Sequence, residues 1–312
     1  PKGMSMLELL DSPYRITEPM YHQPDGSWKR ISYQEAVGMI VERMKKVRDT
    51  YGQKSGEHVA MTMPLWDCLE SEIAALMALR TVGSVHAMPP GETCVSTASN
   101  MLGLMIGVNC GSTKVDELPR AETIVLWGAN VNDLYPPYTR WLKAAHDGGT
   151  KIIYIDPRLT RTSIWCDSQL RPQPGPDGVL AIGAIRYILE KGAYDEARAR
   201  FQIDDFDNLA QQSERFTLDY VQSVTGLGRN EIVALYDTLC TSTRTIVWLG
   251  GSLSRQTNGI ITDRAIILMQ ALRDNLIGEG RGMLTFQSGK PGGGEELVDH
   301  FFGELKTPKM NF

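Results

Sequence analysis

Two stretches decide the fold: residues 122–130 read ETIVLWGAN, and residues 151–158 read KIIYIDPR. Each opens with a short apolar run and ends in a loop marked by glycine or proline. Residues 136–146 between them have helical spacing and close at Gly148-Gly149. A strand, a helix and a strand at this spacing predict a βαβ unit with parallel strands and a right-handed crossover.

A third apolar run, residues 245–249, enters Gly250-Gly251 and precedes a helix expected over about 257–275. Three strands that run straight into such loops predict an α/β fold, with Rossmann-like parallel sheets and flanking helices. In an open parallel sheet, ligands bind outside the carboxyl ends of the strands. Glycine there lets backbone N–H groups approach a phosphate, and the next helix N-terminus favours negative charge.

Single residues in these loops fit a nucleotide-like ligand. Asp156 can accept from ribose hydroxyls, and Arg158 can pair with a phosphate through two hydrogen bonds. The alternatives are structural: Gly128 and Gly250 can be tight turns, and Asp156 can cap a helix. No GxGxxG pattern occurs, which argues against a standard dinucleotide dehydrogenase. The residues alone predict a nucleotide-like ligand on an α/β sheet.

Three regions are expected along the chain. Residues 1–55 form a lead-in segment and a first helix, which a capping pattern at Ser32 begins and Tyr51 ends. Residues 56–245 form the α/β cofactor-binding domain. Residues 246–312 form a strand, loop and helix that belong to a second lobe or return to the first.

Composition narrows the class of protein. The chain has 312 residues and a net charge of −5, and no run of lysine or arginine occurs, so nucleic acid is not expected as a partner. No apolar run approaches the roughly 20 residues that cross a bilayer, so direct membrane insertion is not expected. Its five cysteines are widely spaced without a CxxC pair, which favours free thiols and the cytoplasm over the periplasm.

Six segments, in order, resemble the dimethyl sulfoxide reductase family of molybdopterin enzymes, which includes formate dehydrogenases, nitrate reductases and acetylene hydratase. The segments are Pro1-Lys2-Gly3, residues 15–36 (RITEPM to WKRISYQEA), residues 126–130 (LWGAN), residues 155–160 (IDPRLT), residues 174–177 (PGPD, including Gly175) and residues 250–259. Chance matches do not keep such an order. The resemblance covers residues 1 to about 290.

The resemblance implies a cofactor and a metal. Two molybdopterin guanine dinucleotides hold one Mo or W atom through four dithiolene sulfurs, and the protein adds one ligand. Cys94 stands at the matching place and is the implied ligand, and a thiolate suits such a metal. The alternative for Cys94 is a small buried core residue. The other cysteines are expected to be structural: Cys68, Cys110, Cys166 and Cys240.

The resemblance also implies roles for other residues. Lys2 matches a lysine between a [4Fe–4S] cluster and the pterin; the alternative is an exposed terminal lysine. Asp177 would accept from the guanine N–H donors, or would cap the helix expected over 177–191. The remaining implied cofactor contacts are Gly128, Asn130, Asp156, Arg158, Thr160, Gly175, Gly250, Gly251, Arg255 and Gln256.

The sequence departs from the family pattern in several places. Val95 stands where formate dehydrogenases have histidine, which weakens a formate assignment. Ser252 and Arg255 replace the usual glycine and glutamine. The iron–sulfur cysteines expected before Pro1 and a C-terminal β-barrel are absent from these residues, so an incomplete chain or a split subunit is expected.

The expected function is two-electron chemistry on a small-molecule substrate, with electrons passing to an iron–sulfur module or subunit. Three alternatives stay open: a non-redox hydratase-type member, a metal-free structural relative in an electron-transfer complex, and a nicotinamide-dependent dehydrogenase. Metal analysis would distinguish the expected metal-containing enzyme from a metal-free structural relative.

Overall fold

The computed structural model describes residues 2–62, 69–88, 96–108 and 110–285. By its internal contacts the chain forms two compact units. One comprises Pro1–Pro90 with Gly294–Phe312, and the other comprises Gly91–Gly293. The limits of the three regions drawn from the sequence stay a prediction.

The amino-terminal unit is built from short elements. Its α2 helix begins after Ser32, which accepts from the Glu35 backbone while the Glu35 side chain accepts from the Ser32 backbone, so the capping box expected there is confirmed. The lead-in segment contains a two-stranded antiparallel hairpin. The bounds are η1 (Lys2–Ser5), α1 (Met6–Leu10), β1 (Met20–His22), β2 (Trp28–Arg30), α2 (Tyr33–Tyr51), η2 (Gly52–His58), β3 (Ala60–Thr62), α3 (Leu69–Arg80) and β4 (His86–Met88).

The second unit contains a five-stranded parallel sheet in the order β7-β6-β5-β8-β9. The strands are β5 (Thr123–Trp127), β6 (Lys151–Ile155), β7 (Ser168–Leu170), β8 (Thr245–Leu249) and β9 (Gly282–Thr285). The βαβ prediction is confirmed for β5 and β6, because Thr123 pairs with Lys151 and Trp127 with Ile155. From β5 the chain moves outward to β6 and β7 and then returns to β8 on the other side of β5. The strand order therefore reverses between β5 and β8.

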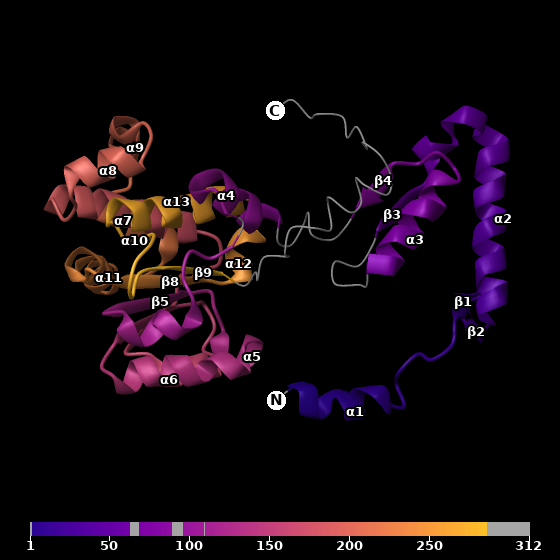
Figure 1. Ribbon diagram of the computed structural model, residues 1–312, viewed down its shortest axis with the longest axis horizontal. Coiled ribbons are helices and arrows are strands. Elements are labelled where there is room, and N and C mark those ends of the chain that lie inside the picture. The colour runs from indigo at the N-terminus through magenta and orange to yellow at the C-terminus, as the bar shows by residue number, and fades with distance from the viewer. Residues whose placement is uncertain (1, 63–68, 89–95, 109, 286–312) are drawn as a thin grey trace. The chain divides into compact units, whose positions relative to one another are not determined.

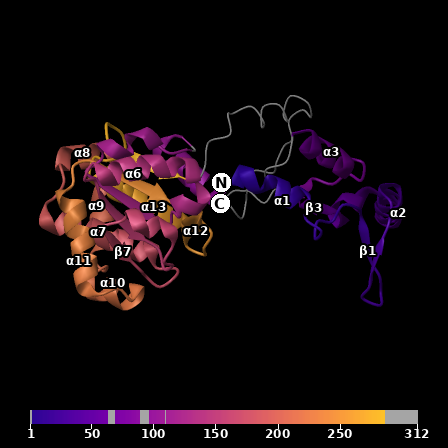
Figure 2. The same ribbon diagram turned by 90° about the horizontal axis from the view of Figure 1, so that it is seen from below.

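Helices cover both faces of this sheet (Figures 1 and 2). One face packs under α7, α11 and α13 around a large apolar cluster that includes Val125, Val247 and Met283. The other face packs on α6 around Leu142, Ile152 and their neighbours. The helices are α4 (Ser96–Ile106), η4 (Val115–Arg120), α5 (Val131–Leu134), η5 (Pro136–Tyr138), α6 (Thr139–Asp147), η6 (Arg161–Trp165), α7 (Asp177–Lys191), α8 (Glu196–Gln202), α9 (Phe206–Ser213), α10 (Leu218–Thr225), α11 (Arg229–Thr241), α12 (Gly251–Ser254) and α13 (Gly259–Leu272).

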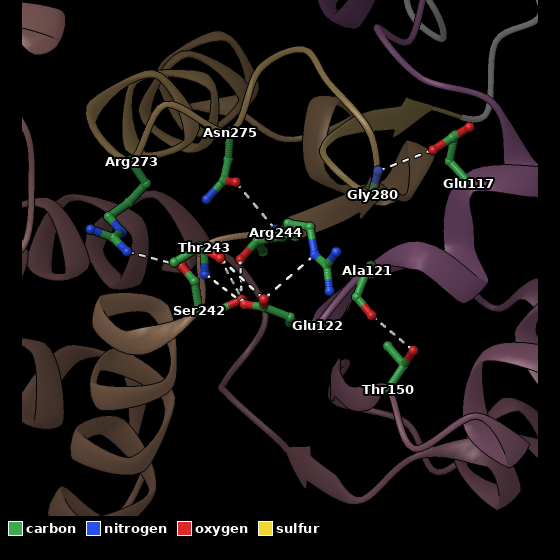
Figure 3. Close-up of polar contacts among 11 residues, drawn as sticks. Glu117, Ala121, Glu122, Thr150, Ser242, Thr243, Arg244, Arg273, Asn275 and Gly280 are labelled. Carbon is green, nitrogen blue, oxygen red and sulfur yellow. Dashed lines mark hydrogen bonds and ion pairs between the residues drawn. The ribbon is translucent and has the colours of Figure 1, made fainter.

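Polar contacts join the amino ends of the strands (Figure 3). The Thr243 backbone N–H donates to Glu122 Oε2 at 2.8 Å, and Arg244 Nε lies 3.4 Å from Glu122 Oε1. The Thr150 hydroxyl donates to the Ala121 carbonyl at 2.9 Å. These contacts fix the loop before β8 against the starts of β5 and β6.

Among the described residues, no helix combines the length and the apolar character that a membrane span requires.

Candidate functional site

The carboxyl edge of the sheet brings the loops after β5 and β8 into backbone contact. The N–H of Gly250 donates to the carbonyl of Trp127 at 2.8 Å, and the N–H of Gly128 donates to the carbonyl of Ile155 at 2.7 Å. A Cβ atom added at Gly250 would lie 1.8 Å from the Gly128 carbonyl oxygen. The two glycines predicted from the sequence therefore meet where the strand order reverses, the place where open α/β sheets bind ligands.

Asp177 is a buried carboxyl at the first residue of α7. The Trp127 indole donates to its Oδ1 at 2.9 Å. Burial raises the pKa of Asp177, and hydrogen bonds from Trp127 and Gln256 oppose that rise. A Cβ atom at Gly175, whose φ is +117°, would lie 3.6 Å from Gln256 Oε1. The structure thus groups Gly175, Asp177 and Gln256, although they lie up to about 80 residues apart in the sequence.

The loop after β6 places Asp156 at the same edge. The Tyr154 hydroxyl donates to Asp156 Oδ2 at 3.0 Å, and the Arg158 backbone N–H donates to Oδ1 at 2.8 Å. Thr160 shares a hydrogen bond of 3.0 Å with the Tyr154 hydroxyl. Arg158 is exposed, and its guanidinium has no ion pair among residues 2–62, 69–88, 96–108 and 110–285. It is free to take a ligand phosphate.

The Asn130 side chain is engaged within the protein. Its Oδ1 accepts from the Thr162 hydroxyl at 2.7 Å, and its Nδ2 donates to Asp133 at 2.8 Å. The fully buried Thr162 also accepts from the Asn132 backbone at 3.0 Å. The side chain of Asn130 therefore ties the loop after β5 to η6, and its backbone carbonyl accepts from the Leu134 N–H at 3.0 Å.

The remaining candidates are distributed as follows. Gly251 is the first residue of α12, and Arg255 follows that helix at its C-cap. The positive charge of Arg255 opposes the rise that burial causes in the pKa of Tyr135. Lys2 belongs to the amino-terminal unit, in η1. Cys94 lies outside the described residues.

Sequence reasoning missed Trp127, Tyr154 and Thr162. Each holds a candidate residue in place: Trp127 donates to Asp177, Tyr154 to Asp156, and Thr162 to Asn130. A polar-tipped aromatic within an otherwise aliphatic strand was the available signal for the first two, because a buried Trp or Tyr usually finds a hydrogen-bond partner.

Three cysteines predicted to be structural are free thiols: Cys110, Cys166 and Cys240. Burial raises the pKa of the Cys166 thiol to about 12, and its Sγ donates to the Thr162 carbonyl at 3.4 Å. A thiol held protonated in this way is a poor metal ligand. No group of three or more His, Cys, Asp or Glu side chains suited to a metal occurs in the part of the chain that the structure describes.

These residues fit a nucleotide-bearing cofactor. Because Gly250 packs closely against Gly128, backbone atoms and not side chains lie at the carboxyl edge between β5 and β8. The amino terminus of α7 lies beside it with a buried carboxyl that suits N–H donors. Together they define an α/β protein with a ligand site at the carboxyl edge of a parallel sheet.

Comparison with known proteins defines the family. A family model for molybdopterin oxidoreductases matches residues 15–299. The chain belongs to the molybdopterin oxidoreductase family, and the resemblance seen in the sequence is confirmed. The family implies molybdopterin as cofactor.

Individual relatives are distant. The chain is 23% identical over 266 residues to YrhE of Bacillus subtilis, a protein provisionally named a formate dehydrogenase, covering 85% of this chain and 27% of that protein. It is 24% identical to the assimilatory nitrate reductase catalytic subunit of the same organism, covering 94% of this chain and 41% of that protein. Acetylene hydratase from Pelobacter acetylenicus has a similar fold, with a TM-score of 0.69 at 20% identity over 91% of this chain and 38% of that chain. The chain thus spans about a quarter to two-fifths of the length of these proteins.

Proposed function

We propose that the chain is the cofactor-binding core of a molybdenum or tungsten oxidoreductase whose metal is held by two molybdopterin guanine dinucleotides. The observation that carries this proposal is the convergence of Gly128, Gly250 and the buried Asp177 at one edge of the parallel sheet. A bulky ligand with phosphates and a guanine base matches the backbone, the helix terminus and the carboxyl found there.

Different residues of the chain bind different parts of the cofactor. Asp177 accepts from the guanine N–H groups while Trp127 and Gln256 hold its carboxyl in position. Asp156 accepts from ribose hydroxyls, and Arg158 pairs with a phosphate. The loop from Gly250 to Gln256 lines the pterin.

Cys94 is the proposed protein ligand of the metal, and Lys2 the proposed charge beside the electron path. The bound metal supplies two-electron redox chemistry to a small-molecule substrate. An iron–sulfur cluster outside these residues would accept the electrons, and Lys2 would place its positive charge beside that path. The names of the relatives suggest formate, nitrate and acetylene as the first substrates to test.

Analysis of the purified chain tests the proposal. We expect about one Mo or W atom and two pterins per chain, with one guanosine monophosphate released per pterin on acid hydrolysis. Pterin with metal but turnover of acetylene alone would favour a hydratase-type member. A chain without metal and pterin would indicate a structural relative and would overturn the proposal.

A substitution tests the metal ligand. Cys94→Ala should abolish turnover while the circular dichroism spectrum and pterin content stay close to those of the unmodified chain, because the dithiolene sulfurs still hold the metal. Cys110→Ala is the matched control and should retain activity. Full activity in the Cys94 variant would remove this residue from the coordination sphere.

A further inference from the structure

Ser252 brings a hydroxyl group to the carboxyl edge of the sheet that the fold itself does not use. The residue is exposed and is the second residue of α12. Among the residues that the structure describes, its Oγ atom has no hydrogen-bond partner. Serine also replaces the glycine that is usual in the family at this position. A hydroxyl with no partner in the protein is available to a ligand.

The Ser252 hydroxyl lies beside the turn that follows β5. A Cβ atom added at Gly128, whose φ is +64°, would lie 2.8 Å from Ser252 Oγ. The N–H of Gly128 donates to the carbonyl of Ile155 at 2.7 Å, and Ile155 directly precedes Asp156. Gly128 is thus in contact with the loop after β6 and with the loop after β8. The hydroxyl of Ser252 therefore lies where these loops meet.

The backbone around Ser252 is held in place by the protein. Gln256 Nε2 donates to the carbonyl of Ser252 at 3.2 Å, and the Gln256 side chain also forms a hydrogen bond with Asp177. The N–H of Leu253 donates to the carbonyl of Gly250 at 3.2 Å. A donor that is already held in position loses less conformational freedom when a ligand binds.

A second donor lies in the loop after β5. Asn130 is only partly buried, and its backbone N–H donates to no acceptor within the described ranges. It follows Gly128 by two residues. Backbone N–H groups and hydroxyls that lack an acceptor suit an anion whose oxygens accept several hydrogen bonds, and a phosphate is such an anion.

We propose that the Ser252 hydroxyl donates a hydrogen bond to a phosphate oxygen of the cofactor. The inference rests on the function proposed above, in which Asp156 and Asp177 bind the nucleoside and the loop over 250–256 lines the pterin. The diphosphate joins these two parts of the cofactor, and Ser252 lies where the corresponding loops of the protein meet. Hydrogen bonds to a charged oxygen are stronger than those between neutral groups, so this contact should slow release of the cofactor.

The first arm of the test uses the full chain made in a host that lacks molybdenum-cofactor synthesis. Because the Ser252 hydroxyl has no partner in the protein, Ser252→Ala should keep the unfolding equilibrium constant within about twofold of the wild type. The exposed Ser223→Ala is the matched control, since the Ser223 hydroxyl bonds only the Tyr220 carbonyl of its own helix, at 2.7 Å. A clearly larger loss in Ser252→Ala than in the control would show that the hydroxyl serves the fold, and would overturn the inference.

The second arm uses the same variants made in a host that synthesises the cofactor. The rate of pterin release after dilution, followed by fluorescence of the free pterin, should rise about ten- to a hundredfold in Ser252→Ala, the effect expected for one hydrogen bond to a charged group. Ser223→Ala should release pterin at the wild-type rate. A wild-type release rate in Ser252→Ala would overturn the inference.

Phosphorus NMR of the loaded chain identifies the group that Ser252 contacts. Loss of a hydrogen bond to a phosphate oxygen should shift at least one phosphorus resonance in Ser252→Ala and none in Ser223→Ala. Faster release with an unchanged phosphorus spectrum would place the hydroxyl against another part of the cofactor and would contradict the phosphate contact.

The two proposals can fail separately. If the wild-type chain carries no pterin when made in the host that synthesises the cofactor, the proposed function fails, and the ligand for Ser252 is lost with it. If the wild type carries pterin and Ser252→Ala releases it at the same rate, only the inference about Ser252 fails.

Discussion

Gly250 shows at the scale of one residue why the carboxyl edge of the sheet needs glycine. Its φ is −83° and its ψ is 149°, values open to any residue. The requirement is for space, since an added Cβ would lie 1.8 Å from the Gly128 carbonyl oxygen and 2.9 Å from the Ala129 nitrogen. From the sequence, glycine was expected here because it lets backbone N–H groups approach a phosphate. The contact between the two loops could not be expected, because it depends on the pairing of β5 with β8.

Gly250→Ala should therefore lower the free energy of unfolding by about 1–3 kcal/mol, because the backbone of one loop must move. Urea unfolding measures the change. Gly103→Ala is the control, since a Cβ there meets nothing within 4 Å, and alanine within helix α4 should raise stability by about 0.5–1 kcal/mol. Equal small effects at both positions would contradict the close contact of the loops.

The Trp127 indole gives a second residue-scale prediction. It donates to the buried Asp177 at 2.9 Å, so Trp127→Phe should cost about 1–3 kcal/mol of unfolding free energy. Trp165→Phe, whose indole lies 3.4 Å from Asn132 Oδ1, should cost less. A larger loss at Trp165 would show that the Trp127 contact contributes little. Asp177 was identified from the sequence, whereas its donor fifty positions earlier was missed.

At the scale of elements, prediction from the sequence succeeded where the residue pattern of a single strand or helix was enough to identify it. The apolar runs at β5, β6 and β8 and the helix at α7 lie within a residue of their expected bounds. Strand β9 was missed because Gly282–Thr285 lies in a glycine-rich stretch, and it is a strand only because β8 offers an edge to pair with. The helix expected over 136–146 begins as a 3-10 turn at its two prolines.

The contact between the starts of β5 and β8 predicts a pH effect. The Thr243 backbone N–H holds the pKa of Glu122 below its usual range. Its contribution to stability is therefore present above the ordinary pKa of Glu and is lost as pH falls through the lowered value. Because the Glu122 side chain is 41% exposed, Glu122→Gln should cost at most about 1 kcal/mol at pH 7.

The same substitution should cost less at an acidic pH below the lowered pKa of Glu122, where the carboxyl is protonated with or without the contact. Urea unfolding at the two pH values measures the difference, with the exposed Glu214→Gln as control. An equal loss at both pH values would show that Glu122 acts through its shape and not its charge.

At the scale of the whole chain, the order of motifs along the sequence was enough to identify the family. Six weak segments in register carried more information than any one of them. The order of the motifs does not show which loops meet in space. Gly128 meets Gly250 because β5 pairs with β8, the two strands between which the strand order reverses.

Hydrogen exchange on the whole chain, made in hosts with and without molybdenum-cofactor synthesis, tests the central claim most directly. We expect the cofactor to slow exchange at residues 128–131, 156–162, 175–178 and 250–256. Exchange near Glu122 and Thr243, at the opposite edge of the sheet, should stay the same. Protection confined to that amino edge, or no protection in a chain that carries pterin, would contradict a cofactor site at the carboxyl ends of the strands.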